Sequence, residues 1–341
     1  MKLFVTGVAG QLGHDVMNEL ARRGHTGIGS DIAPVYSGAQ DATAVASMPY
    51  LQMDITDQES VNKIITEVKP DALIHCAAWT AVDLAEDEDK KEKVYAINAA
   101  GTGYLADVCR KLGSKMMYIS TDYVYNGQGT IPWEPDCRDY APLNVYGRTK
   151  LEGELAVSSA LERFFIVRIA WVFGKNGKNF IKTMLNLGKT HDTLRVVDDQ
   201  IGTPTYTYDL ARLLVDMIET EQYGYYHATN SELPEETGAY TEEGCKTGYI
   251  SWYDFTKEIF RQAYAMGHEE YAPQRLTILP VTTAEYGISK AKRPFNSRLS
   301  KEKLNENGFT PLPDWQDALR RYLQEIDVRL KSFINDEGDL E

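Results

Sequence analysis

The sequence has few cysteines and no long apolar segment. Its four cysteines show neither a CxxC pair nor a nearby histidine spacing; they are Cys76, Cys109, Cys137 and Cys245. This spacing fits neither a zinc site nor a disulfide framework, so we expect free thiols in a reducing compartment. No run approaches the ~20 apolar residues that a membrane-spanning helix needs. Glycines and acidic residues interrupt the N-terminal apolar stretch before it resembles a signal peptide, so we expect a cytoplasmic protein with no membrane partner.

An excess of positive charge is also missing. The 50 Asp and Glu residues outnumber the 36 Lys and Arg residues, which gives a net charge of -14 at pH 7. Nucleic acids bind through clustered positive charge, so we expect no nucleic-acid partner. A hydrophobic content of 43% and a charged content of 25% are typical of globular proteins with a buried core. The 341 residues suffice for one large domain or two lobes.

Strand-like and helix-like segments alternate through the first 170 residues. The predicted strands are 2–6, 26–30, 51–53, 71–75, 115–120 and 164–170. The predicted helices are 11–23, 58–68, 87–112 and 144–160, and 32–48 reads as a loop with a short helix. This alternation predicts a Rossmann-type α/β fold with a doubly wound parallel sheet.

Beyond residue 170 the pattern loosens into helices separated by single short strands. The helices are expected at 180–187, 207–221, 252–266 and 314–333. We therefore predict an NAD(P)-binding domain over 1–170 and a smaller mixed α/β substrate-binding lobe over 171–341. Parts of 194–222 are expected to pack back on the first domain, and 233–248, rich in Glu, Thr and Gly, reads as an exposed insertion.

A GxxGxxG motif directly follows the first predicted strand and opens the first helix. Its members include Gly7, Gly10, Gln11, Leu12 and Gly13. Glycine permits a tight turn with positive φ and lets a pyrophosphate approach the positive end of the helix. The motif therefore predicts a dinucleotide site.

Two carboxylates follow the next strands. Asp31 ends the second strand, at the offset where a carboxylate accepts hydrogen bonds from the ribose of NAD. It would repel the 2′-phosphate of NADP, and no Lys or Arg follows within a few residues, so NADH is favoured over NADPH. Asp54, with Ile55, is placed to receive the adenine amine; the alternative for Asp54 is a helix N-cap.

Tyrosine and lysine four residues apart share one helix face, and this pairing suits carbonyl reduction. A nearby ammonium lowers the pKa of a phenol that protonates the developing alkoxide. The spacing occurs three times, at Tyr146 and Lys150, at 253 and 257, and at 286 and 290. Only Tyr146 begins a helix after the fifth strand, whose carboxyl end carries Thr121. We expect the first pair to be functional.

Several motifs in order resemble the dTDP-4-dehydrorhamnose reductase family of extended short-chain dehydrogenases/reductases. They are 7–13, AAWTAVD at 77–83, STDYVY at 120–125, YGRTK at 146–150, RIAWVFG at 168–174, KNFIKTML at 178–185, VVDDQIGTPT at 196–205 and RPFNS at 293–297. The resemblance covers nearly the whole chain. It implies reduction of the C4 keto group of dTDP-4-dehydro-β-L-rhamnose by NADH or NADPH, giving dTDP-β-L-rhamnose for dTDP-rhamnose biosynthesis.

The resemblance also implies residue roles. Tyr146 is the proton donor, Lys150 holds the nicotinamide ribose and lowers the tyrosine pKa, and Thr121 hydrogen-bonds the substrate carbonyl. Further implied cofactor contacts are Ala77, Ala78, Trp79 and Asn98. Implied substrate contacts, besides Thr121, are Asp122, Tyr123, Trp171, Asn179, Gln200, Thr203 and Arg293. Arg293 is expected on the diphosphate, because a guanidinium pairs with phosphate oxygens; an ordinary surface arginine is the alternative.

Metal binding and assembly stay open at this level. Some relatives hold Mg²⁺ at a dimer interface through acidic side chains, and Asp15 occupies a position that fits. A lone carboxylate in a first helical turn is more often solvated, so we expect no metal site. The sequence does not decide the oligomeric state, and a homodimer is one option.

Other functions on the same scaffold compete with the reductase reading. A 4,6-dehydratase carries Asp-Glu after the threonine, whereas Asp122 and Tyr123 follow Thr121 here. Another nucleotide-sugar 4-reductase or a 4-epimerase stays open. A non-catalytic regulatory subunit like that of methionine adenosyltransferase is a further alternative, disfavoured by the complete glycine motif and the retained Thr, Tyr and Lys.

Overall fold

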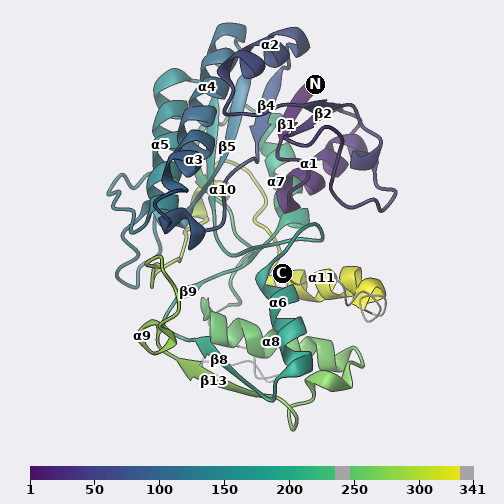
Figure 1. The fold of residues 1–341 in the computed structure, drawn as a ribbon, viewed down its shortest axis with the longest axis vertical. Helices are drawn as coiled ribbons and strands as arrows, with labels where there is room; N and C mark the ends of the chain where they lie inside the picture. Colours follow the sequence, from purple (N-terminus) through teal and green to yellow (C-terminus); the bar gives the residue numbers. More distant parts are fainter. Residues whose placement is uncertain (235–245, 331–341) are drawn as a thin grey trace.

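A seven-stranded parallel sheet organises the larger layer of the protein (Figure 1). The structure is a computed structural model that describes residues 1–234 and 246–330. The strand order is β11-β6-β5-β4-β1-β2-β3. The strands are β1 (Lys2–Thr6), β2 (Thr26–Asp31), β3 (Tyr50–Gln52), β4 (Ala72–His75), β5 (Lys115–Thr121), β6 (Phe164–Ile169) and β11 (Gly224–His227). The order reverses between β1 and β4, and such a reversal leaves a crevice at the carboxyl ends of the strands.

Helices cover both faces of this sheet, which confirms the predicted doubly wound fold. One face carries α2 (Gln58–Val68), α4 (Gly101–Leu112) and α5 (Val145–Ala160), and the other carries α1 (Gln11–Arg22) and α7 (Thr207–Ile218). The long helix predicted at 87–112 is broken up: α3 (Lys91–Tyr95) is followed by a π-helical turn over Ala96–Ala100 before α4 begins. Inserted π turns are frequent at functional sites.

A smaller layer lies beside the carboxyl edge of the sheet (Figure 1). Its helices are α6 (Phe180–Thr190), α8 (Trp252–Ala265), α9 (Thr283–Tyr286) and α11 (Trp315–Leu330). Its paired strands are β7 (Val172–Phe173) with β10 (Thr205–Tyr206), β8 (Thr193–Val197) with β13 (Thr277–Val281), and β9 (Ile201–Gly202) with β12 (Ile250–Ser251). An aromatic core that includes Phe173, Phe255, Trp315 and Tyr322 holds these elements together.

The chain crosses between the two layers more than once. From beyond residue 170, β11 extends the large sheet by pairing with β6, and α7 packs on α1. The short α10 (Glu302–Glu306) contacts β11. A four-residue strand gives too weak a periodic signal to be assigned to the sheet from sequence. Of the predicted insertion at 233–248, residues 235–245 lie outside the described part, while Leu233 and Gly248 form an antiparallel bridge.

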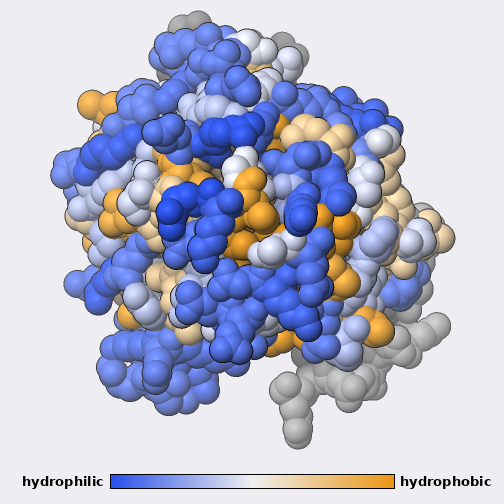
Figure 2. All heavy atoms as spheres, turned by 90° about the horizontal axis from the view of Figure 1, so that it is seen from above, coloured by the Kyte–Doolittle hydropathy of each residue, from blue (hydrophilic) through white to orange (hydrophobic). Residues whose placement is uncertain are grey.

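The surface agrees with the charged composition. The face seen in Figure 2 is largely hydrophilic, with hydrophobic residues gathered in patches between hydrophilic ones. Among the helices in 1–234 and 246–330, none combines the length and apolar character of a membrane span. Within the same ranges, Cys76, Cys109 and Cys137 are free thiols, as predicted; Cys245 lies outside them.

Candidate active site

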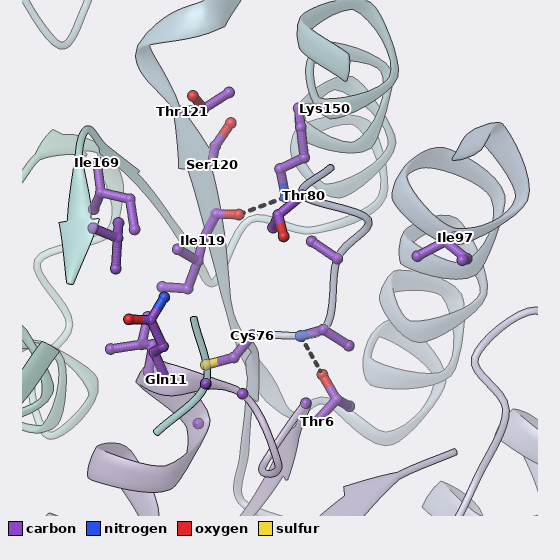
Figure 3. A pocket seen from close by; sticks show the side chains of 18 of the residues that line it. Thr6, Gln11, Cys76, Thr80, Ile97, Ile119, Ser120, Thr121, Lys150 and Ile169 are labelled. Carbon is purple, nitrogen blue, oxygen red and sulfur yellow. Dashed lines mark hydrogen bonds between the residues drawn. The ribbon is translucent and has the colours of Figure 1, made fainter. Parts of the chain in front are cut away.

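A cavity of about 770 Å³ opens at the carboxyl ends of the central strands, a size typical of small-molecule sites (Figure 3). Sixteen of the residues proposed from the sequence line it. They are Gly7, Gly10, Gln11, Leu12, Gly13, Asp31, Asp54, Ile55, Ala77, Ala78, Thr121, Asp122, Tyr123, Tyr146, Lys150 and Trp171. The structure therefore gathers both proposed cofactor residues and proposed catalytic residues around one space.

The glycine motif forms the floor of the cavity between β1 and α1. Gly7 has a φ of +73°, and a Cβ there would lie 2.6 Å from the backbone nitrogen of Ala77. A Cβ at Gly13 would lie 2.3 Å from the carbonyl oxygen of Gly7. Only glycine fits either position, so the motif brings bare backbone and the positive end of α1 to the cavity surface.

Asp31 lies at the end of β2 with its carboxylate fixed by backbone groups. Its Oδ2 accepts a hydrogen bond from the backbone N–H of Ala9 at 3.0 Å, and its Oδ1 accepts one from that of Ile32 at 2.8 Å. These bonds hold a negative charge at the rim of the cavity, beside the glycine motif.

Thr121, Asp122 and Tyr146 lie together on the wall of the cavity, and the first two are buried. Thr121 ends β5, and Tyr146 stands in the first turn of α5, which Asn144 caps by accepting the N–H of Gly147 at 2.8 Å. The Thr121 hydroxyl donates to Asp122 Oδ1 at 3.0 Å and is also hydrogen-bonded to the Tyr146 hydroxyl.

Burial shifts the pKa values of these groups. It raises the pKa of Tyr146 above its ordinary range, although the Thr121 hydrogen bond acts in the opposite direction. It raises the pKa of Asp122 to about 6, opposed by hydrogen bonds from Ser297 and Thr121. The Tyr146 hydroxyl therefore keeps its proton at neutral pH and can donate it.

Lys150 lies one helical turn after Tyr146 and is 2% exposed. Its ammonium donates to the carbonyl oxygen of Ile119 at 2.7 Å (Figure 3) and lies 4.0 Å from the centre of the Tyr118 ring. Burial lowers the pKa of Lys150 to about 7, while the nearby Glu154 carboxylate counteracts this shift. The predicted lowering of the Tyr146 pKa by Lys150 stays a prediction.

Comparison with known proteins places the chain in a family. The model of the RmlD substrate binding domain matches residues 1–328. The chain is 35% identical over 330 residues to a dTDP-4-dehydrorhamnose reductase of Escherichia coli (strain K12), which covers 96% of this chain and 98% of that protein. The chain belongs to the RmlD family of dTDP-4-dehydrorhamnose reductases.

Two further relatives agree with this placement. The spore coat polysaccharide biosynthesis protein SpsK of Bacillus subtilis (strain 168) is 36% identical over 95% of this chain and 97% of its own length. A crystal structure of dTDP-4-dehydrorhamnose reductase from Bacillus anthracis in complex with NADP superposes with a TM-score of 0.78 at 35% identity, over 95% of this chain and 100% of that one. The fold and the reductase family thus confirm the resemblance drawn from the sequence motifs.

The cavity of this RmlD family member fits a dinucleotide. The glycine floor leaves room for backbone contact with a diphosphate. Two further lining residues, Ser30 and Ser120, have buried hydroxyls with no hydrogen-bond partner in the described ranges. A buried hydroxyl without a partner costs roughly 1–3 kcal/mol, and a polar ligand would remove this cost. The chain is an NAD(P)-dependent oxidoreductase by fold and family.

Six of the proposed site residues lie outside the cavity lining: Trp79, Asn98, Asn179, Gln200, Thr203 and Arg293. Asn98 is buried in the π-helical turn, and its amide oxygen accepts the backbone N–H of Trp79 at 2.8 Å. Asn179 caps α6 and donates to Gln11 Oε1 at 3.1 Å. Both asparagines hold residues near the lining in place, rather than line the cavity themselves.

The other three outlying residues have protein partners. The Gln200 side chain donates to the Thr283 hydroxyl at 3.0 Å, and the Thr203 hydroxyl is bonded to that of Thr229 at 2.8 Å. The Arg293 guanidinium pairs with Asp83, with an Nη2 to Oδ2 distance of 2.7 Å. The sequence motifs did not reveal these partners.

The alternative reading of Asp54 as a helix cap is wrong. Asp57 caps α2 and accepts the backbone N–H groups of Glu59 and Ser60 at 3.0 and 3.2 Å. Asp54 is exposed on the cavity rim and accepts the N–H and hydroxyl of Thr56. The cap lies three residues later because α2 begins only at Gln58.

The metal expectation concerns Asp15. Its carboxylate accepts the Thr207 hydroxyl at 2.5 Å, and burial raises its pKa to about 7. No group of three or more potential metal ligands occurs among residues 1–234 and 246–330. The nearest charged partners of Asp15 include Lys175 as well as Glu325 and Asp41.

Sequence reasoning missed several lining residues. Besides Ser30 and Ser120, the cavity is lined by Thr6, Cys76, Thr80, Ile97, Ile119, Lys178 and Trp252. Ser120 directly precedes Thr121, so its place at the strand end was available as a signal. Trp252 lies 131 positions after Thr121, and only the packing of α8 brings it to the cavity.

Proposed function

We propose that this protein reduces the C4 keto group of dTDP-4-dehydro-β-L-rhamnose with NADH or NADPH, forming dTDP-β-L-rhamnose for dTDP-rhamnose biosynthesis. The observation that carries the proposal is the convergence of Thr121, Tyr146 and Lys150 on one cavity with the glycine motif. Family membership supports the sugar nucleotide as substrate, because several relatives are named for this reaction.

In the proposed reaction Tyr146 protonates the sugar oxygen. A bound nicotinamide cofactor supplies the hydride. The Thr121 and Tyr146 hydroxyls lie close together. A carbonyl oxygen seated between them would receive a hydrogen bond from Tyr146, and one from Thr121 once the Thr121 hydroxyl turns away from Asp122. Such donors stabilise the negative charge that develops on the oxygen. The Lys150 ammonium, one helical turn after Tyr146, would stabilise the Tyr146 phenolate that remains after proton transfer.

We infer a preference for NADH over NADPH. Asp31 supports this, because backbone bonds from Ala9 and Ile32 fix its carboxylate at the rim of the cavity. Like charges at close range are costly, so this carboxylate disfavours a 2′-phosphate. The Bacillus anthracis relative was solved with NADP, which makes the preference a property to measure on this chain.

Among the proposed substrate contacts, those that line the cavity are favoured. Asp122, Tyr123 and Trp171 lie on its wall, and the Tyr123 ring is 5.5 Å from that of Tyr146. Arg293 is paired with Asp83, so a diphosphate would compete with this carboxylate for the guanidinium. The roles of Asn179, Gln200 and Thr203 are better explained by the hydrogen bonds that they make within the protein.

The decisive experiment follows NADH oxidation with a panel of dTDP-4-keto sugars. We expect turnover with dTDP-4-dehydro-β-L-rhamnose and release of NAD⁺ in equal amount. An epimerase would regenerate its cofactor without net NADH loss, and a regulatory subunit would show no turnover. Either result would refute the proposal, and preference for a stereoisomer would correct the substrate.

A further inference from the structure

Trp171 has a backbone conformation that a bulky side chain rarely adopts. Its φ is +51°, in the left-handed region that normally favours glycine. Non-glycine residues in this region cost of order 1–3 kcal/mol and persist where the surrounding structure fixes them, commonly at functional sites. The backbone carbonyl of Trp171 accepts the N–H of Thr205 at 3.1 Å, which holds the strained residue at the start of β7. The conformation places the side chain on the cavity wall.

Trp252 stacks on Trp171. The two ring centres are 3.8 Å apart with an angle of 19° between the planes. Both indoles are only partly buried, and both line the cavity. Trp252 also packs against Phe180, with 4.5 Å between ring centres and an angle of 49° between the planes. The paired indoles therefore make a continuous apolar wall that ends at the cavity.

Contacts within the smaller layer fix the position of Trp252. It is the first residue of α8, whose N-terminus Ser251 caps in a reciprocal box with Asp254. In β12, Ile250 pairs with Gly202 of β9. A Cβ on Gly202 would lie 3.4 Å from the Trp171 ring and 3.1 Å from the Ser297 side chain, so this strand packs closely beneath the indole. The short β9–β12 pair thus fixes the start of α8 at Trp252 and packs against the Trp171 ring.

We propose that Trp252 is a positioning residue that holds the Trp171 indole in its strained position, so that the two rings form the surface on which the sugar ring of the substrate packs. The inference rests on the proposed function, because its ligand is the sugar nucleotide. Sugar rings carry an apolar C–H face, and a rigid aromatic wall orders such a face at low entropic cost. Thr121 and Tyr146, on the same cavity, would then meet the C4 oxygen.

The test separates sugar binding from catalysis and cofactor binding. In Trp252→Leu we expect the KM for the dTDP-4-keto sugar to rise about threefold to tenfold, since aromatic pairs contribute on this scale. The value of kcat should change much less, and the Kd for NADH should be unchanged. Trp252→Phe keeps an aromatic partner and should restore most of the KM. Trp133→Phe is the matched control, because Trp133 stacks on Tyr125 at 4.4 Å but does not line the cavity.

A spectroscopic readout tests the pair without turnover. Two indoles this close should give an exciton couplet in the far-ultraviolet circular dichroism, where the strong indole transition lies, and Trp252→Phe and Trp171→Phe should each abolish it. Saturating dTDP-L-rhamnose should perturb the wild-type couplet. An unperturbed couplet, or an unchanged KM in Trp252→Leu, would overturn the inference. Absence of wild-type turnover with every dTDP-4-keto sugar would instead refute the proposed function. The titration with dTDP-L-rhamnose would still test whether a sugar nucleotide packs against the two indoles.

Discussion

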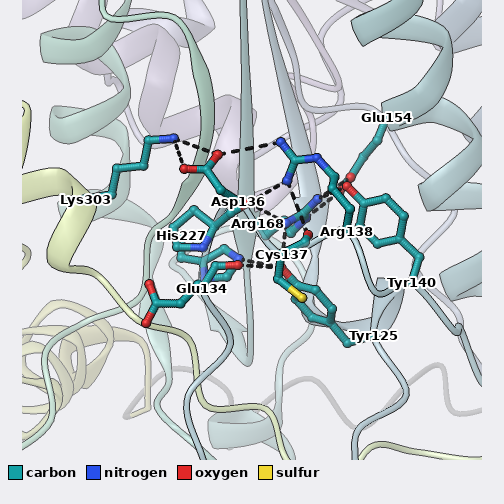
Figure 4. Close-up of polar contacts among 11 residues, drawn as sticks. Tyr125, Glu134, Asp136, Cys137, Arg138, Tyr140, Glu154, Arg168, His227 and Lys303 are labelled. Atoms are coloured by element: carbon teal, nitrogen blue, oxygen red, sulfur yellow. Dashed lines mark hydrogen bonds and ion pairs between the residues drawn. The ribbon is translucent and has the colours of Figure 1, made fainter.

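Arg168 and Glu154 form a bidentate ion pair in the interior, between β6 and α5 (Figure 4). The guanidinium Nε and Nη2 donate to the two carboxylate oxygens at 2.8 and 2.7 Å, and both side chains are fully buried. Arg168 also donates to the hydroxyls of Tyr125 and Tyr140. Glu154 lies two helical turns after Tyr146, on the helix that also carries Lys150, so this network fixes the helix on which the proposed acid stands.

Breaking that pair should destabilise the fold. We expect Glu154→Gln to lower the free energy of unfolding by about 3–5 kcal/mol, because it leaves the Arg168 charge buried and unbalanced. Urea denaturation would measure the change, and the double variant Glu154→Gln/Arg168→Met should recover part of the loss. Glu88→Gln, at an exposed pair with Lys91, is the control and should have little effect. Similar losses of unfolding free energy in Glu154→Gln and Glu88→Gln would show that burial does not make the Glu154–Arg168 pair more important than an exposed pair.

Removing the phenol of Tyr146 should stop catalysis without preventing cofactor binding. We expect Tyr146→Phe to lower kcat by about 10²–10⁴, the range for loss of a general acid. The Kd for NADH, measured by fluorescence titration, should stay close to the wild-type value. Tyr286→Phe is the control, because Tyr286 also lies four residues before a lysine but stands on the exposed α9. Its kcat should equal that of the wild type. Wild-type kcat in Tyr146→Phe would exclude this residue as the proton donor.

Neutralising Asp31 should weaken the cofactor preference. Asp31→Asn keeps an oxygen that can accept the Ala9 N–H but removes the charge. We expect the ratio of kcat/KM for NADPH to that for NADH to rise about tenfold, as repulsion of the 2′-phosphate is lost. Asp54→Asn, on the same cavity rim, should leave the ratio nearly unchanged. A wild-type enzyme that strongly prefers NADPH would show that the role assigned to Asp31 is wrong.

The partly buried Asp15 should make stability depend on pH. Loss of solvation raises its pKa to about 7 in the folded chain, well above the ordinary value of an aspartate. Between these values the folded state binds more protons than the unfolded state, so this group lowers stability as pH rises. Asp15→Asn has no carboxyl group to titrate at this position. Its free energy of unfolding should therefore exceed that of the wild type by about 1–3 kcal/mol between pH 4 and pH 7. Urea denaturation midpoints of both proteins across this pH range would measure the difference in stability. A difference that does not change with pH would refute the raised pKa of Asp15.

Much of the fold and half of the site could be predicted because their signals are local. Strand–helix alternation specified the parallel sheet, and α2 has the bounds expected from its apolar spacing. The glycine motif and Asp31 are positioned by the turn that follows each strand, within one β-α-β unit. Tyr146 and Lys150 needed one further step, because three pairs shared their spacing and only the order of elements selected one.

Contacts between distant segments could not be predicted. The Asp83–Arg293 pair joins residues 210 positions apart. It uses the guanidinium for which the sequence offered two alternatives, a diphosphate contact or an ordinary surface arginine. Trp252 reaches Trp171 only because β9 and β12 pair across the smaller layer. No local periodicity records such pairing, since it depends on which surfaces remain to be buried after each element has formed.

The sequence by itself therefore determined the parallel sheet, the glycine floor of the cavity and the placement of Thr121, Tyr146 and Lys150 on its lining, because strand ends and helix starts fix these side chains over short distances. Only the tertiary structure decided which polar groups are already satisfied within the protein, how burial shifts their pKa values and which aromatic rings close the cavity, because these properties arise from the packing of segments far apart in the chain.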